Sequence, residues 1–132
     1  QFAVSGGNVC AIAQRRGIAG FVVDGVIRDL AEVREMGFPV FARGVVPKPG
    51  AKKCVDPLNQ PVNCGGVTVH PGDIIVADEE GIAVVPQASA AEAFDIAKKR
   101  ADKDSSMTLD EWQAKHHDNV EAILSKLGFS DT

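Results

Sequence analysis

The first third of the chain alternates between two spacings of its apolar residues. Apolar side chains recur at helical spacing over residues 8–16 and again over 30–36, which predicts two amphipathic helices, each ended by a glycine. Continuous apolar runs over 18–23 and 38–42 predict buried strands. The resulting order of helix, strand, helix and strand indicates parallel α/β connections.

The second part of the chain has a different pattern. Residues 46–61 are rich in Pro, Gly and Lys and are expected to form an exposed loop. Short apolar runs separated by Gly-containing turns then predict a compact antiparallel or barrel-like group of strands, over 61–64, 67–69, 74–77 and 81–85. Helical spacing returns near the end and predicts one helix over 88–103 and a last helix over 109–127.

Composition narrows the classes of protein that fit this pattern. A chain of 132 residues corresponds to about one domain, and 45% apolar residues suffice for a core. The net charge of −4 argues against a general nucleic-acid binder, which presents a basic face. No apolar run approaches the roughly 18 residues of a membrane-spanning helix. Cys10, Cys54 and Cys64 lack the paired spacing of metal sites and are expected to be free thiols, so we expect a reducing, cytoplasmic location.

The strongest candidate for chemistry is the segment GFVVDGVIRD, where an apolar strand ends in the adjacent residues Arg28 and Asp29. An arginine can hold a substrate carboxylate through two parallel hydrogen bonds. An aspartate is a hard oxygen ligand for a divalent cation. Together they predict a site that binds a small oxo-acid against a metal ion.

Other polar residues have simpler interpretations. Arg28 and Asp29 themselves could form only a surface ion pair at a strand end. The acidic residues of 78–81 are typical of turns between strands, and His70 precedes a proline in a turn. His116 and its neighbour His117 are expected on a solvated helix face. Glu32 follows Asp29 by one helical turn and could either face the site or lie on the helix surface.

Three blocks of this sequence, in this order, carry a family likeness: a Gly-Gly turn followed one helix and one strand later by Arg-Asp, then GFPVFARG, then PVNCGGVTVHPGDIIVADEEGIAVVP. They resemble the RraA-like family, which includes the metal-dependent 4-hydroxy-4-methyl-2-oxoglutarate / 4-carboxy-4-hydroxy-2-oxoadipate aldolases. The likeness runs from about Gly6 to Pro86 and more loosely to Asp104. It implies a layered α/β/β/α fold of the swivelling-domain type.

The resemblance also implies roles for residues. Arg28 is similar to the arginine that grips the pyruvyl carboxylate and steadies the developing enolate, and Asp29 to the carboxylate that holds Mg²⁺ or Mn²⁺. Gly7, Asn8 and Val9 are similar to the turn whose backbone amides cradle the substrate carboxylate, a role that suits a helix N-terminus. An acidic residue from a neighbouring subunit also approaches the metal in the aldolases, and Asp104, or else Asp102, is its counterpart here.

The implied reaction is retro-aldol cleavage of a 4-hydroxy-2-oxo dicarboxylate to pyruvate and a second oxo-acid, with oxaloacetate decarboxylation as a side activity. No lysine is placed for a Schiff base, so a metal mechanism is preferred. The residues identify no side chain as the base. The alternative is a non-catalytic RraA-type regulator that binds a partner such as ribonuclease E.

Two departures from the family pattern bear on these expectations. The aldolases usually carry Asp where this chain has Gly7, whereas Asp29, which regulatory RraA proteins tend to lack, is present. The chain also begins with Phe2-Ala3-Val4, which is typical of the tail of a strand. We therefore expect residues 1–132 to be the C-terminal part of a single RraA-like domain without its N-terminal half, with C-terminal helices from about residue 88. We also expect the protein to assemble as a homotrimer or homohexamer.

Overall fold

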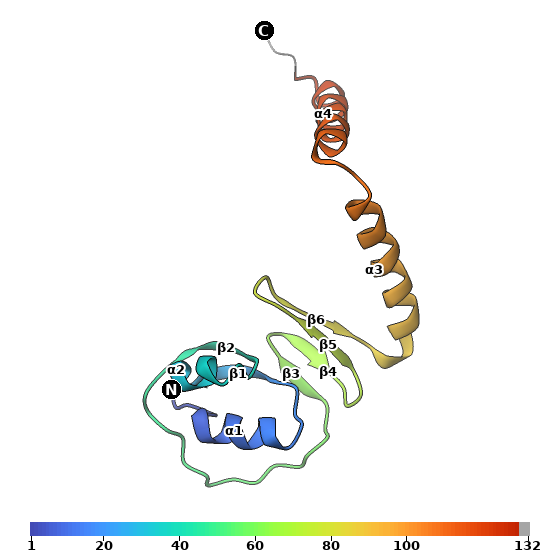
Figure 1. The fold of residues 1–132 in the computed structure, drawn as a ribbon. Helices are drawn as coiled ribbons and strands as arrows, with labels where there is room; N and C mark the ends of the chain where they lie inside the picture. The colour runs from blue at the N-terminus through green and yellow to red at the C-terminus, as the bar shows by residue number, and fades with distance from the viewer. Residues whose placement is uncertain (130–132) are drawn as a thin grey trace. The chain divides into compact units, whose positions relative to one another are not determined.

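The computed structural model describes residues 1–129 of the chain. Its contacts divide the chain into two compact units, Gln1–Pro71 and Gly72–Thr132, which are considered separately below (Figure 1). The assignment of the whole chain to one domain remains a prediction.

The first unit contains the predicted parallel α/β arrangement. Helix α1 (Gly7–Arg15) leads to strand β1 (Phe21–Ile27), and helix α2 (Leu30–Glu35) leads to strand β2 (Val40–Val45). The two strands pair in parallel, with Phe21 opposite Val40. An antiparallel hairpin follows, formed by β3 (Val62–Cys64) and β4 (Val67–Val69). The predicted order of helix, strand, helix and strand is therefore confirmed.

Glycines end both helices of this unit, as the sequence predicts. Gly17 has a φ of 77° and Gly37 a φ of 64°, in the left-handed region that glycine adopts without cost. After α1, the amide of Gly17 donates to the carbonyl of Gln14 and the amide of Ile18 donates to that of Ala13. This pair of bonds is a Schellman motif, which satisfies the last carbonyls of the helix.

Strand β1 differs from its predicted bounds. It begins at Phe21 rather than at residue 18, and it continues through Asp24 and Gly25 to Ile27. The pairing with β2 shifts between Val23 and Val26, so the Asp-Gly pair forms an irregularity within the strand rather than its end. The strand therefore carries its pairing to the residue immediately before Arg28.

The segment before α1 lies along β1. Ala3 forms an isolated parallel bridge with Val26, and the amide of Val4 donates to the carbonyl of Val26 at 2.9 Å. One step further, the amide of Arg28 donates to the carbonyl of Ser5 at 2.9 Å. This alignment brings the Gly6–Gly7 turn next to the end of β1.

A small apolar core lies between the two helices and the sheet of this unit. The buried side chains of Cys10, Ala13, Val33 and Phe38 form one cluster, against which Phe21, Met36 and Val40 pack. The rings of Phe21 and Phe38 meet edge to face, with centroids 5.0 Å apart. On α1 the core uses Cys10 and Ala13, whereas Val9 and Ile12 are exposed.

The second unit begins with a hairpin of β5 (Ile74–Ala77) and β6 (Ile82–Val85). The short 3-10 turn η1 (Gln87–Ser89) connects β6 to helix α3 (Ala90–Ser105), and helix α4 (Leu109–Lys126) follows. The hairpin is antiparallel, as predicted. Thr108 caps α4 through a reciprocal capping box with Glu111. Among residues 1–129, no helix combines the length and apolar character needed to cross a bilayer.

Candidate functional site

The candidate site lies where the end of β1 meets the start of α1. Gly6 and Gly7 are both buried, and they approach the Arg28–Asp29 pair closely. A Cβ atom built on Gly6 would lie 2.5 Å from Oδ2 of Asp29 and 2.8 Å from Cγ of Arg28. Because no real Cβ tolerates such contacts, Gly6 is required for this approach.

Asp29 occupies an uncommon backbone conformation at the start of α2. Its φ and ψ of 60° and 40° place it in the left-handed region, which Asp and Asn tolerate better than other non-glycine residues. This conformation turns the chain from β1 into α2 and directs the carboxylate to α1, where Oδ2 accepts a hydrogen bond from the amide of Gly7 at 3.1 Å. The start of α2 is thus tied to the start of α1.

Arg28 and Asp29 form a loose ion pair. Nε of Arg28 lies 3.6 Å from Oδ2 of Asp29, and the side chains are 40% and 29% exposed. At this exposure and distance the pair contributes little to stability. The guanidinium is therefore accessible from solvent, and its role in holding a carboxylate stays a prediction.

The proposed amide cradle is partly used by the protein itself. The first backbone bond within α1 runs from the amide of Cys10 to the carbonyl of Gly6, so the amides of Gly7, Asn8 and Val9 have no acceptor within the helix. The amide of Gly7 donates to Asp29. Asn8 and Val9 remain the predicted anion-binding positions at this N-terminus.

The oxygen donors at this site fit a hard divalent cation. Glu32 of α2 reaches the same turn as Asp29, because its Oε2 lies 2.1 Å from the Cβ position of Gly7. Among residues 1–129, no three His, Cys, Asp or Glu side chains come together in a group that could hold a metal ion. Mg²⁺ commonly uses one or two protein carboxylates and completes its coordination with water and substrate oxygens. If such a cation binds at this turn, Asp29 and the exposed Glu32 are the carboxylates that would face it.

A second polar cluster supports the irregular part of β1, and sequence reasoning missed it. The carboxylate of Asp24 accepts a hydrogen bond from Nε of Arg43 on β2 and another, at 2.8 Å, from the amide of Gly65 in the β3–β4 turn. The hydrogen bond from Arg43, and after it the one from the Gly65 amide, lowers the pKa of the Asp24 carboxyl. The hydrogen bond to Asp24 in turn raises the pKa of the Arg43 guanidinium. An Asp-Gly pair inside an apolar run was the only signal for this cluster.

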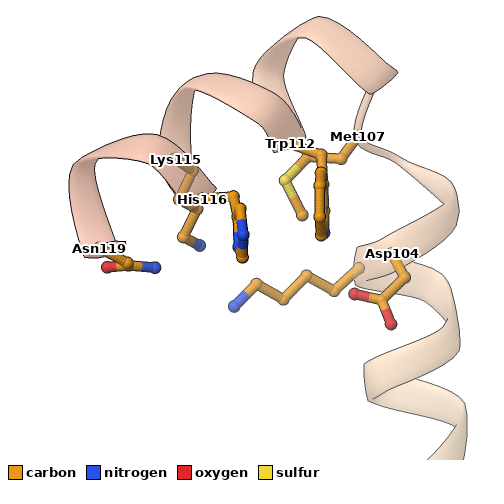
Figure 2. A pocket seen from close by; sticks show the side chains of 7 residues that line it. Asp104, Met107, Trp112, Lys115, His116 and Asn119 are labelled. Carbon is orange, nitrogen blue, oxygen red and sulfur yellow. The ribbon is translucent and has the colours of Figure 1, made fainter. Parts of the chain in front are cut away.

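The two candidates for a metal-directed acidic residue of a neighbouring subunit lie in the second unit, on α3. Asp102 forms an ion pair with Lys98, one turn earlier, at 3.0 Å. Asp104 lines a cavity of about 190 Å³ between the end of α3 and α4 (Figure 2). The other lining residues are Lys103, Met107, Trp112, Lys115, His116 and Asn119.

His116 and His117 are exposed on α4, as the sequence predicts, and His116 also has a stacking partner. Its ring stacks on that of Trp112, with centroids 4.7 Å apart and planes 9° from parallel, as Figure 2 shows. The predicted state of the three cysteines is confirmed, since Cys10, Cys54 and Cys64 are all free. Cys64 is partly buried.

Comparisons with known proteins point to one family. Residues 1–84 match the model of the RraA-like family, described as Aldolase/RraA. A protein of Halalkalibacterium halodurans, named as a candidate 4-hydroxy-4-methyl-2-oxoglutarate aldolase, is 38% identical over 95% of this chain and 57% of its own length. The 4-hydroxy-4-methyl-2-oxoglutarate aldolase of Thermus thermophilus is 38% identical over 64% of this chain and 52% of its own length.

A solved structure extends the likeness to the fold. Streptomyces coelicolor RraAS2, described as an unusual member of the RNase ES inhibitor RraA protein family, superimposes with a TM-score of 0.67 and 36% identity, covering 80% of this chain and 57% of its own. The present chain thus spans little more than half the length of these relatives.

Proposed function

The chain belongs to the RraA-like family and has its α/β fold, and from this premise we propose that it forms the substrate-binding part of a divalent-metal-dependent oxo-acid aldolase. The observation that carries the proposal is the pairing of Arg28 and Asp29 beside the N-terminus of α1. The Gly7 amide donates a hydrogen bond to Asp29 and so links the pair to that helix. Relatives named as aldolases support the same reaction class.

The substrate class follows from the charges at the site. The accessible guanidinium of Arg28 suits a planar carboxylate, and the free N-terminal amides of Asn8 and Val9 favour a negative charge nearby. A 4-hydroxy-2-oxo dicarboxylate offers a carboxylate next to a carbonyl oxygen. Arg28 would hold that carboxylate, and Asp29 with Glu32 would face the cation that the adjacent oxygens require.

The reaction we propose is cleavage of the C3–C4 bond. The hydroxyl on C4 loses its proton, the C3–C4 bond breaks as the C4 carbonyl forms, and the electron pair remains on the pyruvyl half as an enolate, which then gains a proton to give pyruvate. The positive charge of Arg28 is fixed where negative charge develops. A bound Mg²⁺ or Mn²⁺ supplies the Lewis acid that stabilises the enolate. Oxaloacetate decarboxylation requires the same stabilisation and is expected as a side activity.

The test is pyruvate release from 4-hydroxy-4-methyl-2-oxoglutarate and from oxaloacetate, followed with lactate dehydrogenase. We expect release with Mg²⁺ or Mn²⁺, loss after EDTA treatment, and recovery when metal is restored. Full activity in metal-free protein would contradict the metal dependence. No release from either substrate would contradict the aldolase proposal.

A non-catalytic RraA-type regulator is the second candidate, and two observations favour it. Position 7 is glycine, so the carboxylate that aldolases usually carry there is absent, and a structural relative is described as belonging to a family of RNase ES inhibitors. A regulator would bind a ribonuclease and lower its activity without releasing pyruvate. Measuring both activities on one preparation separates the two candidates.

We also propose that the protein self-associates as a trimer or a multiple of it, with Asp104 approaching the metal of a neighbouring subunit. Several large apolar side chains on α3 and α4 are exposed in the chain alone, among them Phe94, Leu109 and Trp112. Light scattering should give a trimer or hexamer, and Asp104→Ala should lower activity while Asp110→Ala, on the exposed first turn of α4, should not. A monomer with a fully active Asp104→Ala variant would contradict this proposal.

A further inference from the structure

Gly7 and Glu32 are fitted to each other. A Cβ built on Gly7 would lie 2.1 Å from Oε2, 3.2 Å from Cδ and 3.3 Å from Cβ of Glu32. The backbone of Gly7 does not itself require glycine, since Gly7 is absent from the residues with positive φ. A side chain at position 7 would therefore have to displace the Glu32 carboxylate from the place that it occupies here.

The Glu32 carboxylate has no protein partner at this position. Within the described part of the chain, neither an ion pair nor a hydrogen bond engages it. The Asp29 carboxylate approaches the same Gly6–Gly7 turn, so two negative groups converge on consecutive residues. Among the described residues, the ion pair that Arg28 forms is with Asp29. The N-terminus of α1 offsets part of this charge. Glu32 is exposed, so water screens its charge and its carboxylate is available to a cation.

We propose that Glu32 is the second carboxylate directed at the divalent cation of the Arg28–Asp29 site, in space that a side chain at position 7 would otherwise fill. The inference rests on the proposed function for the identity of the site, and it adds a residue that positions the cation from α2. The ligand class is a hard divalent cation with oxygen ligands, held by one or two carboxylates and completed by water and substrate oxygens.

The first experiment measures Mn²⁺ binding to the metal-free protein at its natural length by electron paramagnetic resonance, without substrate. Glu32→Gln keeps the shape of the side chain and removes its charge, and we expect its Kd for Mn²⁺ to rise by about 10-fold or more. The matched control is Glu35→Gln, on the same short helix, which should remain within about 2-fold of wild type. An unchanged Kd in Glu32→Gln would overturn the proposal.

The second experiment tests the shared space directly, in EDTA and without metal. Gly7→Ala should lower the midpoint of urea unfolding in the wild-type background, and this loss should become smaller in Glu32→Ala, because the Cδ and Oε2 contacts are then removed and only the 3.3 Å contact with the Cβ of residue 32 remains. The combination Gly7→Asp with Glu32→Ala moves the carboxylate to position 7 and should bring Mn²⁺ affinity back to within about 3-fold of wild type. Additive effects of Gly7→Ala and Glu32→Ala would contradict the fit.

These outcomes are independent of the proposed reaction. Glu32-dependent Mn²⁺ binding in a protein that releases no pyruvate would support this inference and refute the aldolase. Metal-dependent pyruvate release with wild-type Mn²⁺ affinity in Glu32→Gln would refute this inference and leave the aldolase intact.

Discussion

Asp29 has a left-handed backbone conformation, so replacing it with Ala and replacing it with Asn should have different effects on stability. Asn tolerates a φ of 60° and can still accept the hydrogen bond of the Gly7 amide through its side-chain oxygen. Ala does neither. Both substitutions remove the negative charge, so comparing them separates the role of the charge in the reaction from the role of the residue in the fold.

The expected stability changes follow from the contacts of Asp29. An alanine in the left-handed region costs roughly 1–2 kcal/mol, and loss of a hydrogen bond to a backbone amide costs about 1 kcal/mol. The Arg28 contact, 3.6 Å long and partly exposed, adds less than about 1 kcal/mol. Asp29→Ala should therefore lower the free energy of unfolding by about 2–4 kcal/mol, and Asp29→Asn by no more than about 1 kcal/mol.

The expected activities do not follow this order. If the charge of Asp29 faces the cation, both variants should lose at least about 100-fold in kcat/KM for pyruvate release, or ~2.7 kcal/mol of transition-state stabilisation. Urea unfolding followed by circular dichroism gives the stabilities, and the lactate dehydrogenase assay gives the rates. An Asp29→Asn variant with more than half of the wild-type kcat/KM would refute the reasoning.

Three further predictions concern the same unit. Arg28→Lys keeps the charge but loses the planar fork, so kcat/KM should fall at least ~10-fold, roughly 1.4 kcal/mol, and a near-wild-type value would mean that Arg28 is structural. Phe38→Ala removes a buried ring that packs edge to face on Phe21 and should cost about 3–5 kcal/mol in urea unfolding, against less than about 0.5 kcal/mol for Val55→Ala in the exposed loop. The pKa of Asp24 is lowered in the folded state, so its stabilising contribution is present above its unfolded pKa and is lost as the pH falls through the folded value. The difference in free energy of unfolding between wild type and Asp24→Asn should therefore be larger at pH 7 than at pH 3. Equal differences at the two pH values would contradict this.

The sequence predicted those parts of the fold that depend on local chemistry. Gly17 and Gly37 end their helices because only glycine adopts their positive φ without cost, a requirement that a single residue reveals. The Gly65–Gly66 pair likewise marks the β3–β4 turn, since both residues have positive φ. The parallel pairing of β1 and β2 followed from the alternation of helical and continuous apolar patterns.

The parts that the sequence could not predict depend on distant partners. Asp24-Gly25 suggested the end of a strand, but Arg43 and the Gly65 amide hold Asp24 within β1. The direction of Glu32 depends on how α1 and α2 lie together, so its two interpretations could be separated only by the structure, which places it over Gly7. Arg28 and Asp29 could be selected from the sequence because they are adjacent in the chain.

The central claim is that this chain contributes the site of a metal-dependent carbon–carbon bond cleavage. The most direct measurement is proton nuclear magnetic resonance of the reaction of 4-hydroxy-4-methyl-2-oxoglutarate with the protein and Mg²⁺. Cleavage at C3–C4 converts each substrate molecule into two molecules of pyruvate, and the account predicts this stoichiometry with Mg²⁺ and unchanged substrate with EDTA. Unchanged substrate with Mg²⁺, or the same pyruvate yield in EDTA, would contradict it.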